Sequence, residues 1–206
     1  MGNICNFRIL LPVGGKAIIE WGDGKRNTYT GEGGWLSLVH EYPEKDYKMG
    51  VSYYVCIIAE DDILGLWIWD REVNFVNLVV SNCPTLQYLT CVSIGLTRLD
   101  ISQNTNLKEL DCHANHITEL NLDNHYALEV LNCKSNQLIA LNLTHCNALR
   151  WLECSHNPLC TIKLSNKSML VEAIYMDTNL VERVASFLLQ TIEKNKQSSY
   201  AKTHLC

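Results

Sequence analysis

Cysteine, histidine and aspartate side chains occur together in the middle of this sequence, in a pattern that could support chemistry. Cys112 stands between Asp111 and His113, and thiols of the same kind recur every 21 residues. Thiolates bind zinc, and a thiol activated by a histidine and a carboxylate can act as a nucleophile. The pattern therefore raises two hypotheses, a metal site and a thiol-dependent enzyme. The recurring cysteines are Cys91, Cys112, Cys133 and Cys154.

The cysteines belong to a repeating unit, and their place in this unit determines the direction of their side chains. Leucines recur with the same period from Leu86 to Leu170, and a second leucine column follows three residues later. An asparagine stands three residues after three of the cysteines, which gives the pattern L-x-x-L-x-C-x-x-N-x-L-x-x-L-x-L. The period predicts stacked structural units, and the asparagine amides are expected to satisfy backbone groups in the turns. These asparagines are Asn115, Asn136 and Asn157.

The alternation of side chains along the short Leu-x-Cys segment tests both chemical hypotheses. Successive side chains of a strand point to opposite faces, so leucine and cysteine face inward while Asp111 and His113 face outward. Stacked cysteines form a line, whereas zinc ligands must converge on one point. The other histidines of the array, among them His125, are expected as isolated surface side chains. We therefore predict structural cysteines, no metal, no cofactor and no catalytic residues; a thiol-dependent enzyme is the weakest alternative.

The repeat resembles the leucine-rich-repeat family over residues 65–176. Its cysteine column and its 21-residue unit are most similar to bacterial surface proteins of the internalin type. The resemblance implies an α/β solenoid rich in β-structure, in which a right-handed coil builds a parallel β-sheet. It further implies a role in adhesion or host contact, with a location at the cell surface or outside the cell.

Residues 1–64 lack the period and carry β-type runs within 7–11, 17–21, 35–40 and 52–59. A Trp-Gly-Asp-Gly segment at 21–24 predicts a tight reversal directly after a strand. This segment and the later His-Glu-Tyr motif at 40–42 resemble the polycystic-kidney-disease (PKD) repeat, a small β-sandwich. We expect an antiparallel β module that caps the first strand of the solenoid, which would otherwise present an open edge.

The period fades after Tyr175, and apolar residues then recur at helical spacing. The spacing predicts a helix over 177–196 that closes the last repeat, followed by a tail over 197–206. The apolar residues are Leu180, Val184, Phe187, Leu188 and Ile192.

The outward positions of the repeat strands predict a two-dimensional surface for ligand binding. Aromatic, charged and polar side chains alternate on it, and tryptophan, tyrosine and arginine dominate binding hot spots. We predict that this face recognises another protein; a carbohydrate-binding surface is the alternative. Tryptophans at the start of the array could instead pack beneath the N-terminal module. The predicted face consists of Trp67, Trp69, Arg71, Tyr88, Thr90, Glu109, Asp111, His113, Val130, Asn132, Lys134, Trp151 and Glu153.

Composition and charge indicate which classes of binding partner are not expected. The 17 lysines and arginines are scattered and the net charge is −5, so no basic surface for nucleic acid is expected. The longest nearly apolar stretches are far shorter than the roughly 18 residues that a membrane span needs. No secretory signal is visible at the N-terminus, and the location of the protein stays open apart from the resemblance.

Overall fold

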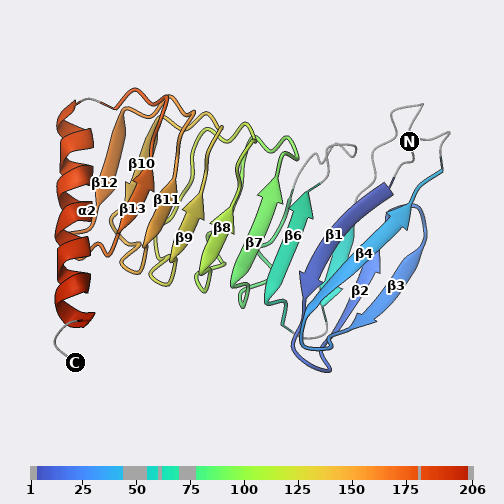
Figure 1. Cartoon of the computed structure of the whole chain (residues 1–206). Coiled ribbons are helices and arrows are strands. Elements are labelled where there is room, and N and C mark those ends of the chain that lie inside the picture. Colours follow the sequence, from blue (N-terminus) through green and yellow to red (C-terminus); the bar gives the residue numbers. More distant parts are fainter. Residues whose placement is uncertain (1–3, 44–54, 60–61, 70–77, 181, 204–206) are drawn as a thin grey trace.

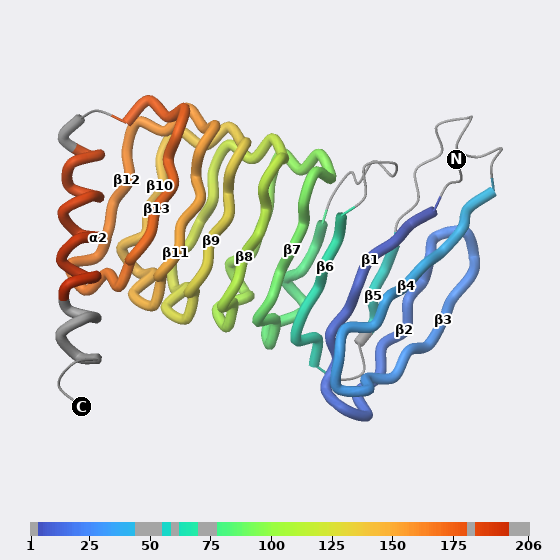
Figure 2. The backbone as a smooth tube through the Cα atoms, in the orientation of Figure 1, coloured from blue at the N-terminus to red at the C-terminus, as the bar shows by residue number. Residues whose placement is uncertain are grey.

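The computed structural model describes residues 4–43, 55–59, 62–69, 78–180 and 182–203. It is a β-solenoid with a mostly parallel sheet, antiparallel strands at the N-terminal end and a C-terminal helix (Figure 1), which confirms the predicted fold class. The chain winds through one coil after another towards the helix (Figure 2).

One eight-stranded sheet runs along the molecule in the order β13-β11-β9-β8-β7-β6-β1-β4. Its repeat strands pair in parallel, and partners such as Leu110 and Leu131 lie 21 positions apart in the chain. Residues that are 21 positions apart in the sequence therefore lie directly beside each other on adjacent strands. The parallel strands are β6 (Gly65–Trp69), β7 (Tyr88–Val92), β8 (Glu109–Asp111), β9 (Val130–Asn132), β11 (Trp151–Glu153) and β13 (Glu172–Ile174). A second parallel pair, β10 (Ala140–Leu143) and β12 (Thr161–Leu164), lies on another side of the coil.

The N-terminal region extends this sheet. Strand β1 (Ile4–Leu10) pairs antiparallel with β6 on one side and with β4 (Trp35–Glu41) on the other. The backbone groups along that edge of β6 are therefore satisfied by β1, so the first repeat strand presents no open edge.

A smaller antiparallel sheet of order β3-β2-β5 forms the second layer of the N-terminal region. Its strands are β2 (Lys16–Glu20), β3 (Arg26–Thr30) and β5 (Cys56–Ala59). The sequence did not predict β3, because its residues are polar and mostly exposed and so lack an apolar alternation. The predicted strand at 52–59 is seen from residue 56, and residues 52–54 lie outside the described part.

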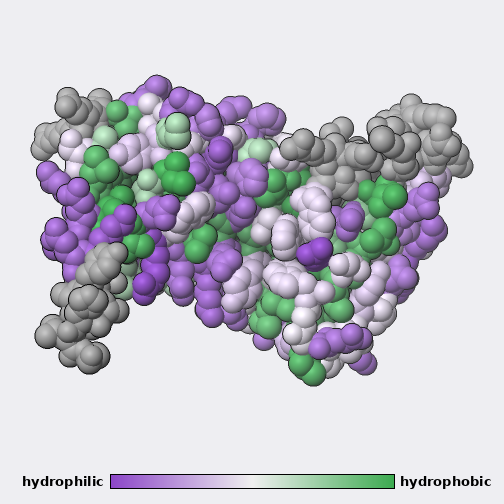
Figure 3. Space-filling model, in the orientation of Figure 1, coloured by the Kyte–Doolittle hydropathy of each residue, from purple (hydrophilic) through white to green (hydrophobic). Residues whose placement is uncertain are grey.

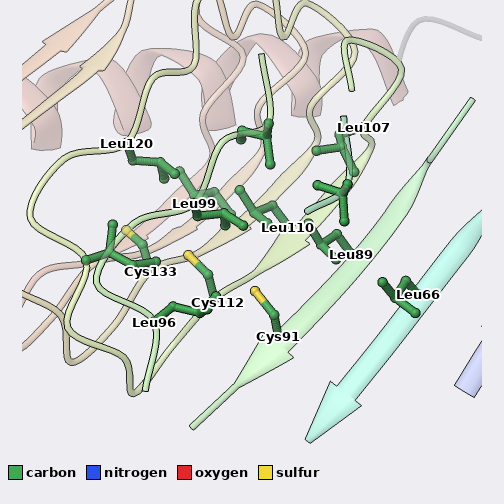
Figure 4. Packing of buried hydrophobic residues seen from close by; sticks show 14 of the residues in the cluster. Leu66, Leu89, Cys91, Leu96, Leu99, Leu107, Leu110, Cys112, Leu120 and Cys133 are labelled. Atoms are coloured by element: carbon green, nitrogen blue, oxygen red, sulfur yellow. The ribbon is translucent and has the colours of Figure 1, made fainter. Parts of the chain in front are cut away.

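The core of the solenoid consists of stacked columns of leucine and cysteine. The leucine and cysteine side chains of β7 and their counterparts in the following repeats are almost completely buried. Figure 4 shows Cys91, Cys112 and Cys133 in a line across successive coils, with leucines packed around them. A buried cysteine behaves as a small apolar side chain, so this line adds to the packed core.

The helix α2 (Glu182–Thr203) covers the last coil. It buries Leu188 and Ile192, and the Asn195 amide Nδ2 donates hydrogen bonds to the carbonyls of Ser168 (3.0 Å) and Leu170 (2.8 Å). The predicted helix bounds were wrong at both ends: residues 177–180 are not helical, and the helix continues from 197 to Thr203, through the first seven residues of the predicted tail. The segment 197–203 contains neither glycine nor proline, so nothing in its sequence stops a helix. Within the described residues, no helix is both long and apolar enough to cross a membrane.

Candidate functional site

The outward side chains of the large sheet lie in rows that run across the strands. Strand pairing places Tyr88, Glu109, Val130, Trp151 and Glu172 in one row. The neighbouring row is Arg8, Trp67, Thr90, Asp111, Asn132 and Glu153. The second row alone brings together residues that are 145 positions apart in the chain, Arg8 and Glu153, and the two rows contain most of the predicted face.

A groove with a cavity volume of about 630 Å³ lies on this face. It runs from the N-terminal strands across β7, β8 and β9 to β11. The space-filling view shows pale side chains, of the intermediate hydropathy of tryptophan and tyrosine, over β1 and β6 (Figure 3). The residues that line the groove are Leu10, Trp35, Trp67, Tyr88, Leu89, Thr90, Glu109, Leu110, Asp111, Val130, Asn132 and Trp151.

Aromatic rings gather at the N-terminal end of the groove. Trp35 lies on β4, yet its ring reaches over the backbone of Gly65 in β6, where a Cβ atom would stand 2.5 Å from Trp35 Cη2. The ring centroids of Trp35 and Trp67 are 6.1 Å apart in an edge-to-face arrangement. Only glycine at position 65 leaves room for this close approach.

Arg8 lies against the same aromatic group. Its guanidinium carbon is 5.1 Å from the ring centroids of both Trp67 and Trp69, within the range of cation–π attraction. The two predicted positions of these tryptophans, beneath the N-terminal module or exposed, are therefore both partly realised. The rings contact Arg8 of β1, yet Trp67 keeps 37% of its surface exposed.

Two carboxylates lie in the middle of the groove. Glu109 is exposed, and its side chain makes no ion pair or hydrogen bond with the described residues. Asp111 is half-buried, and its Oδ1 lies 2.7 Å from His113 Nδ1 and accepts a hydrogen bond from the His113 backbone N–H at 3.2 Å. Glu109 is thus the more available of the two negative charges.

Glu153 was predicted on the exposed face, and this was wrong: only 7% of its surface is accessible. Its Oε1 accepts a hydrogen bond from the backbone N–H of Ser155 at 3.0 Å, so the carboxylate folds back onto the end of its own strand. Asp111 and Asn132 accept the same kind of bond from residues two positions later. Part of this row therefore caps strand ends.

The other predicted face residues are half-buried positions on the same surface. Trp151 closes the far end of the groove, while His113 and Lys134 lie one row outside its lining. Arg71 lies outside the described residues. Leu89 and Leu110 border the groove although their side chains are buried in the core, as predicted. The groove residues that the sequence did not predict are Leu10 and Trp35, and Arg8 lies beside them. For Leu10, Arg8 and Trp35 no periodic pattern could have predicted these positions, because the three residues precede the repeat.

The predicted asparagines connect consecutive coils. Asn115 Oδ1 accepts hydrogen bonds from the backbone N–H groups of Ile94 (3.2 Å) and Leu96 (3.0 Å). Its Nδ2 donates to the carbonyls of Cys91 and Cys112 at 2.7 and 2.9 Å. Asn136 and Asn157 repeat this arrangement one and two coils later. Each buried amide thereby satisfies groups of its own coil and of the preceding one.

The thiols of the cysteine column are held in their protonated form. Burial is the main cause that raises the pKa of Cys112 to about 12, and neighbouring Asp111 raises it further. The pKa of Cys154 is likewise raised to about 12 by burial and by Glu153. The pKa of Cys91 and of Cys133 lies well above the ordinary value for the same main reason. A nucleophilic thiol needs the opposite shift.

Histidines and acidic groups do not converge in the described part of the chain. No group of three or more histidine, cysteine, aspartate or glutamate side chains there could hold a metal ion. The expectation that His125 lies on the surface was wrong, because this side chain is completely buried. It belongs to a second buried column with a period of 21, formed by Asn104, His125 and Cys146. The sequence analysis did not find this column because its three residues are of different types.

Comparisons with known proteins gave a likeness in structure but none in sequence. No protein-family model matches this chain, and no curated protein sequence matches it significantly. Among solved structures, the chain is similar to the functional domain of InlJ from Listeria monocytogenes, a domain that includes a cysteine ladder. The sequences are 21% identical, the TM-score is 0.40, and the match covers 54% of this chain and 39% of the InlJ chain.

Proposed function

We propose that this chain is a non-enzymatic recognition module whose outward sheet face binds another protein. The observation that carries the proposal is the groove of about 630 Å³ on that face. Trp35, Trp67 and Tyr88 line one end and Trp151 the other, with polar side chains between them. Tryptophan and tyrosine are enriched among the residues that dominate binding energy at protein interfaces.

The rigidity of the face supports the proposal. Apart from Trp35 on the edge strand β4, the groove residues stand on strands that are hydrogen-bonded to a neighbour on each side, and three buried asparagines each connect a coil to the one before it. A surface that is already ordered loses little conformational entropy when it binds. The raised pKa of the column thiols also makes a thiol-dependent enzyme the least supported alternative.

The proposal includes a role in adhesion at a cell surface, on the strength of the repeat pattern alone. In the same way, the interpretation of the N-terminal strands as a PKD-like module rests on the Trp-Gly-Asp-Gly and His-Glu-Tyr motifs. Its part in the proposed function is to supply Trp35 and Leu10 to the groove.

An unbiased capture experiment tests the proposal. The intact chain is immobilised as bait beside a Trp151→Ala variant and a Tyr88→Ala variant, and captured proteins are compared quantitatively. Loss of a partner from both variants, with unchanged melting temperatures, is the expected result.

Tyr126→Ala provides the matched control, because Tyr126 is an exposed aromatic residue outside the groove lining. Capture that survives both groove substitutions, or that falls equally with Tyr126→Ala, contradicts the proposal.

Carbohydrate binding is the second candidate, because exposed tryptophan rings can stack on sugar rings. Trp35 and Trp67 keep 38% and 37% of their surfaces exposed at the groove end. Titration with a panel of oligosaccharides should then change the tryptophan fluorescence, and a Trp67→Ala variant should lose the change. A flat response across the panel removes this candidate.

A further inference from the structure

We infer that the groove binds an arginine side chain of the partner protein, between Tyr88 and Glu109; this rests on the proposed function. The lining contains two carboxylates, Glu109 and Asp111, and neither lysine nor arginine. Asp111 has His113 beside it, whereas Glu109 has no hydrogen-bonding or ion-pair partner among the described residues. The groove therefore presents one uncompensated negative charge at its centre.

Any partner that fills the groove removes water from Glu109. A carboxylate that loses its water without gaining hydrogen-bond donors is strongly disfavoured, and a cationic donor compensates its charge best. An apolar or acidic side chain at this point would therefore weaken binding, and a cationic donor would satisfy the carboxylate better than a neutral one. The charge of the groove thus selects a basic partner residue at one defined position.

The neighbouring ring favours arginine over lysine. Tyr88 and Glu109 are paired residues of adjacent strands, so their side chains lie side by side, with the strands about 4.8 Å apart. A planar guanidinium can stack on the ring while its N–H groups point at the carboxylate, a geometry that the ammonium group of lysine cannot reproduce.

The protein uses the same chemistry beside the groove. Arg8 places its guanidinium carbon 5.1 Å from the ring centroids of Trp67 and Trp69. This cation does not neutralise Glu109, because it stacks on the tryptophans of β6, two strand spacings or about 10 Å from β8, which exceeds the Debye length of about 8 Å in physiological salt. The site between Tyr88 and Glu109 likewise has an aromatic ring, but no arginine of this chain lies over it.

The dimensions of the groove indicate a segment of protein chain. From Tyr88 to Trp151 the groove crosses three strand spacings, about 14 Å, which an extended chain of about four residues covers. Val130 and Trp151 offer apolar contact beyond Glu109. An arginine followed at close spacing by an apolar residue therefore fits the whole length.

Matched peptides test the inference. The probe is a capped pentapeptide whose arginine and leucine are two residues apart, so that both side chains lie on one face of an extended chain. Peptides with citrulline or lysine in place of arginine are the comparisons, since citrulline keeps the shape of arginine without its charge. Binding to the intact chain is followed by tryptophan fluorescence and by NMR chemical shifts.

We expect the arginine peptide to bind about tenfold more tightly than the citrulline or lysine peptide, and less tightly as salt is raised. Glu109→Gln should abolish the preference. Glu172→Gln is the matched control, because Glu172 belongs to the same row but lies outside the groove lining. Equal binding of the three peptides, no binding of any of them, or a preference that survives Glu109→Gln overturns the inference.

Failure of this inference can be separated from failure of the proposed function. If Trp151→Ala abolishes partner capture while Glu109→Gln leaves it unchanged, the face binds protein but does not select arginine. If capture survives both substitutions, the face is not the recognition surface. Glu109 has no interaction partner among the described residues, so Glu109→Gln should keep the wild-type melting temperature, and this is measured in parallel.

Discussion

The solenoid and the N-terminal β region satisfy their buried polar groups in different ways. In the solenoid, neutral asparagine amides bond to backbone groups of two successive coils. In the N-terminal region, His40 Nε2 lies 2.9 Å from Asp23 Oδ2, and both side chains are more than 90% buried. The Trp21 ring stacks on His40 with centroids 4.6 Å apart, and the Tyr42 hydroxyl donates to the Trp21 carbonyl at 2.8 Å.

The two solutions respond differently to mutation and to pH. A column of neutral amides does not titrate, and one residue type serves three successive coils. A buried pair of titratable groups is a single, local interaction whose strength depends on protonation. We therefore expect the solenoid to fail when a column is interrupted, and the N-terminal region to weaken in acid.

The largest effect is expected from Cys133→Asp, which places a charge inside the cysteine column. Cys133 is completely buried, so an unpaired carboxylate there should cost several kcal/mol of a total stability of about 5 to 15 kcal/mol. Thermal unfolding should show a strongly lowered melting temperature or no cooperative transition. Cys160→Asp, at an exposed thiol, is the control and should change the free energy of unfolding by less than about 0.5 kcal/mol. Wild-type melting of Cys133→Asp would show that this side chain does not face the core.

The sequence predicted those parts of the fold that depend on a constant spacing. Because each coil repeats the same contacts, the spacing of 21 alone placed the leucines, the column cysteines and Asn115 in the interior. The outward positions of the same strands followed from alternation. The exception was Glu153, whose side chain is buried because it turns back to accept a hydrogen bond from the Ser155 backbone.

The N-terminal end of the groove could not be predicted in the same way. Trp35 reaches the groove only because β1 joins β4 to the first repeat strand and because Gly65 lacks a side chain. Arg8 meets Trp67 through antiparallel pairing across 59 positions of the chain. No period connects these residues, so the sequence pattern contains no information on their contact.

Interrupting the asparagine column should have the next largest effect. Asn136→Ala removes the acceptor of the Ile117 backbone N–H and one donor each from the carbonyls of Cys112 and Cys133. Each carbonyl keeps a bond from a neighbouring asparagine, so we expect a loss of about 3 kcal/mol, mainly from the buried N–H. Urea unfolding measures the loss. The exposed neighbour gives the control Gln137→Ala, and equal effects of the two substitutions would contradict the role of the column.

The buried pair of Asp23 and His40 should make part of the free energy of unfolding depend on pH. Burial raises the pKa of Asp23, but hydrogen bonds from His40 and from the Lys25 backbone outweigh this effect, and the pKa lies below its ordinary value of 3.8. The unfolded chain then binds the proton more readily, so this contribution is complete above the unfolded pKa of about 3.9 and is lost as the pH falls through the folded value.

Asp23→Asn isolates that contribution. The variant should be less stable than the wild type near neutral pH, and the difference should shrink as the pH falls from about 5 to about 2. The fluorescence of Trp21, followed during unfolding at each pH in a chain whose other tryptophans are replaced by phenylalanine, reports on this region. The opposite trend, a difference that grows in acid, would show that the carboxylate is not stabilised as an anion in the folded state.

The smallest effect is expected from glycine substitutions, which should act in opposite directions in the turns and in the strands of the solenoid. Ala114 adopts a left-handed backbone with φ of 56°, and Ser93, Ser135, His156 and Asp177 adopt similar values at the same spacing of 21. This conformation costs a non-glycine residue roughly 1 kcal/mol, which Ala114→Gly would relieve, although the greater freedom of glycine in the unfolded chain offsets part of the gain. Ala140→Gly on strand β10 relieves no strain, so only the greater freedom of glycine in the unfolded chain acts there, and it destabilises the fold. We therefore expect a stabilisation of a few tenths of a kcal/mol for Ala114→Gly and a loss of about 0.5 to 1 kcal/mol for Ala140→Gly, measured by urea unfolding. Effects of equal sign would show that the left-handed turns add no strain to the repeat.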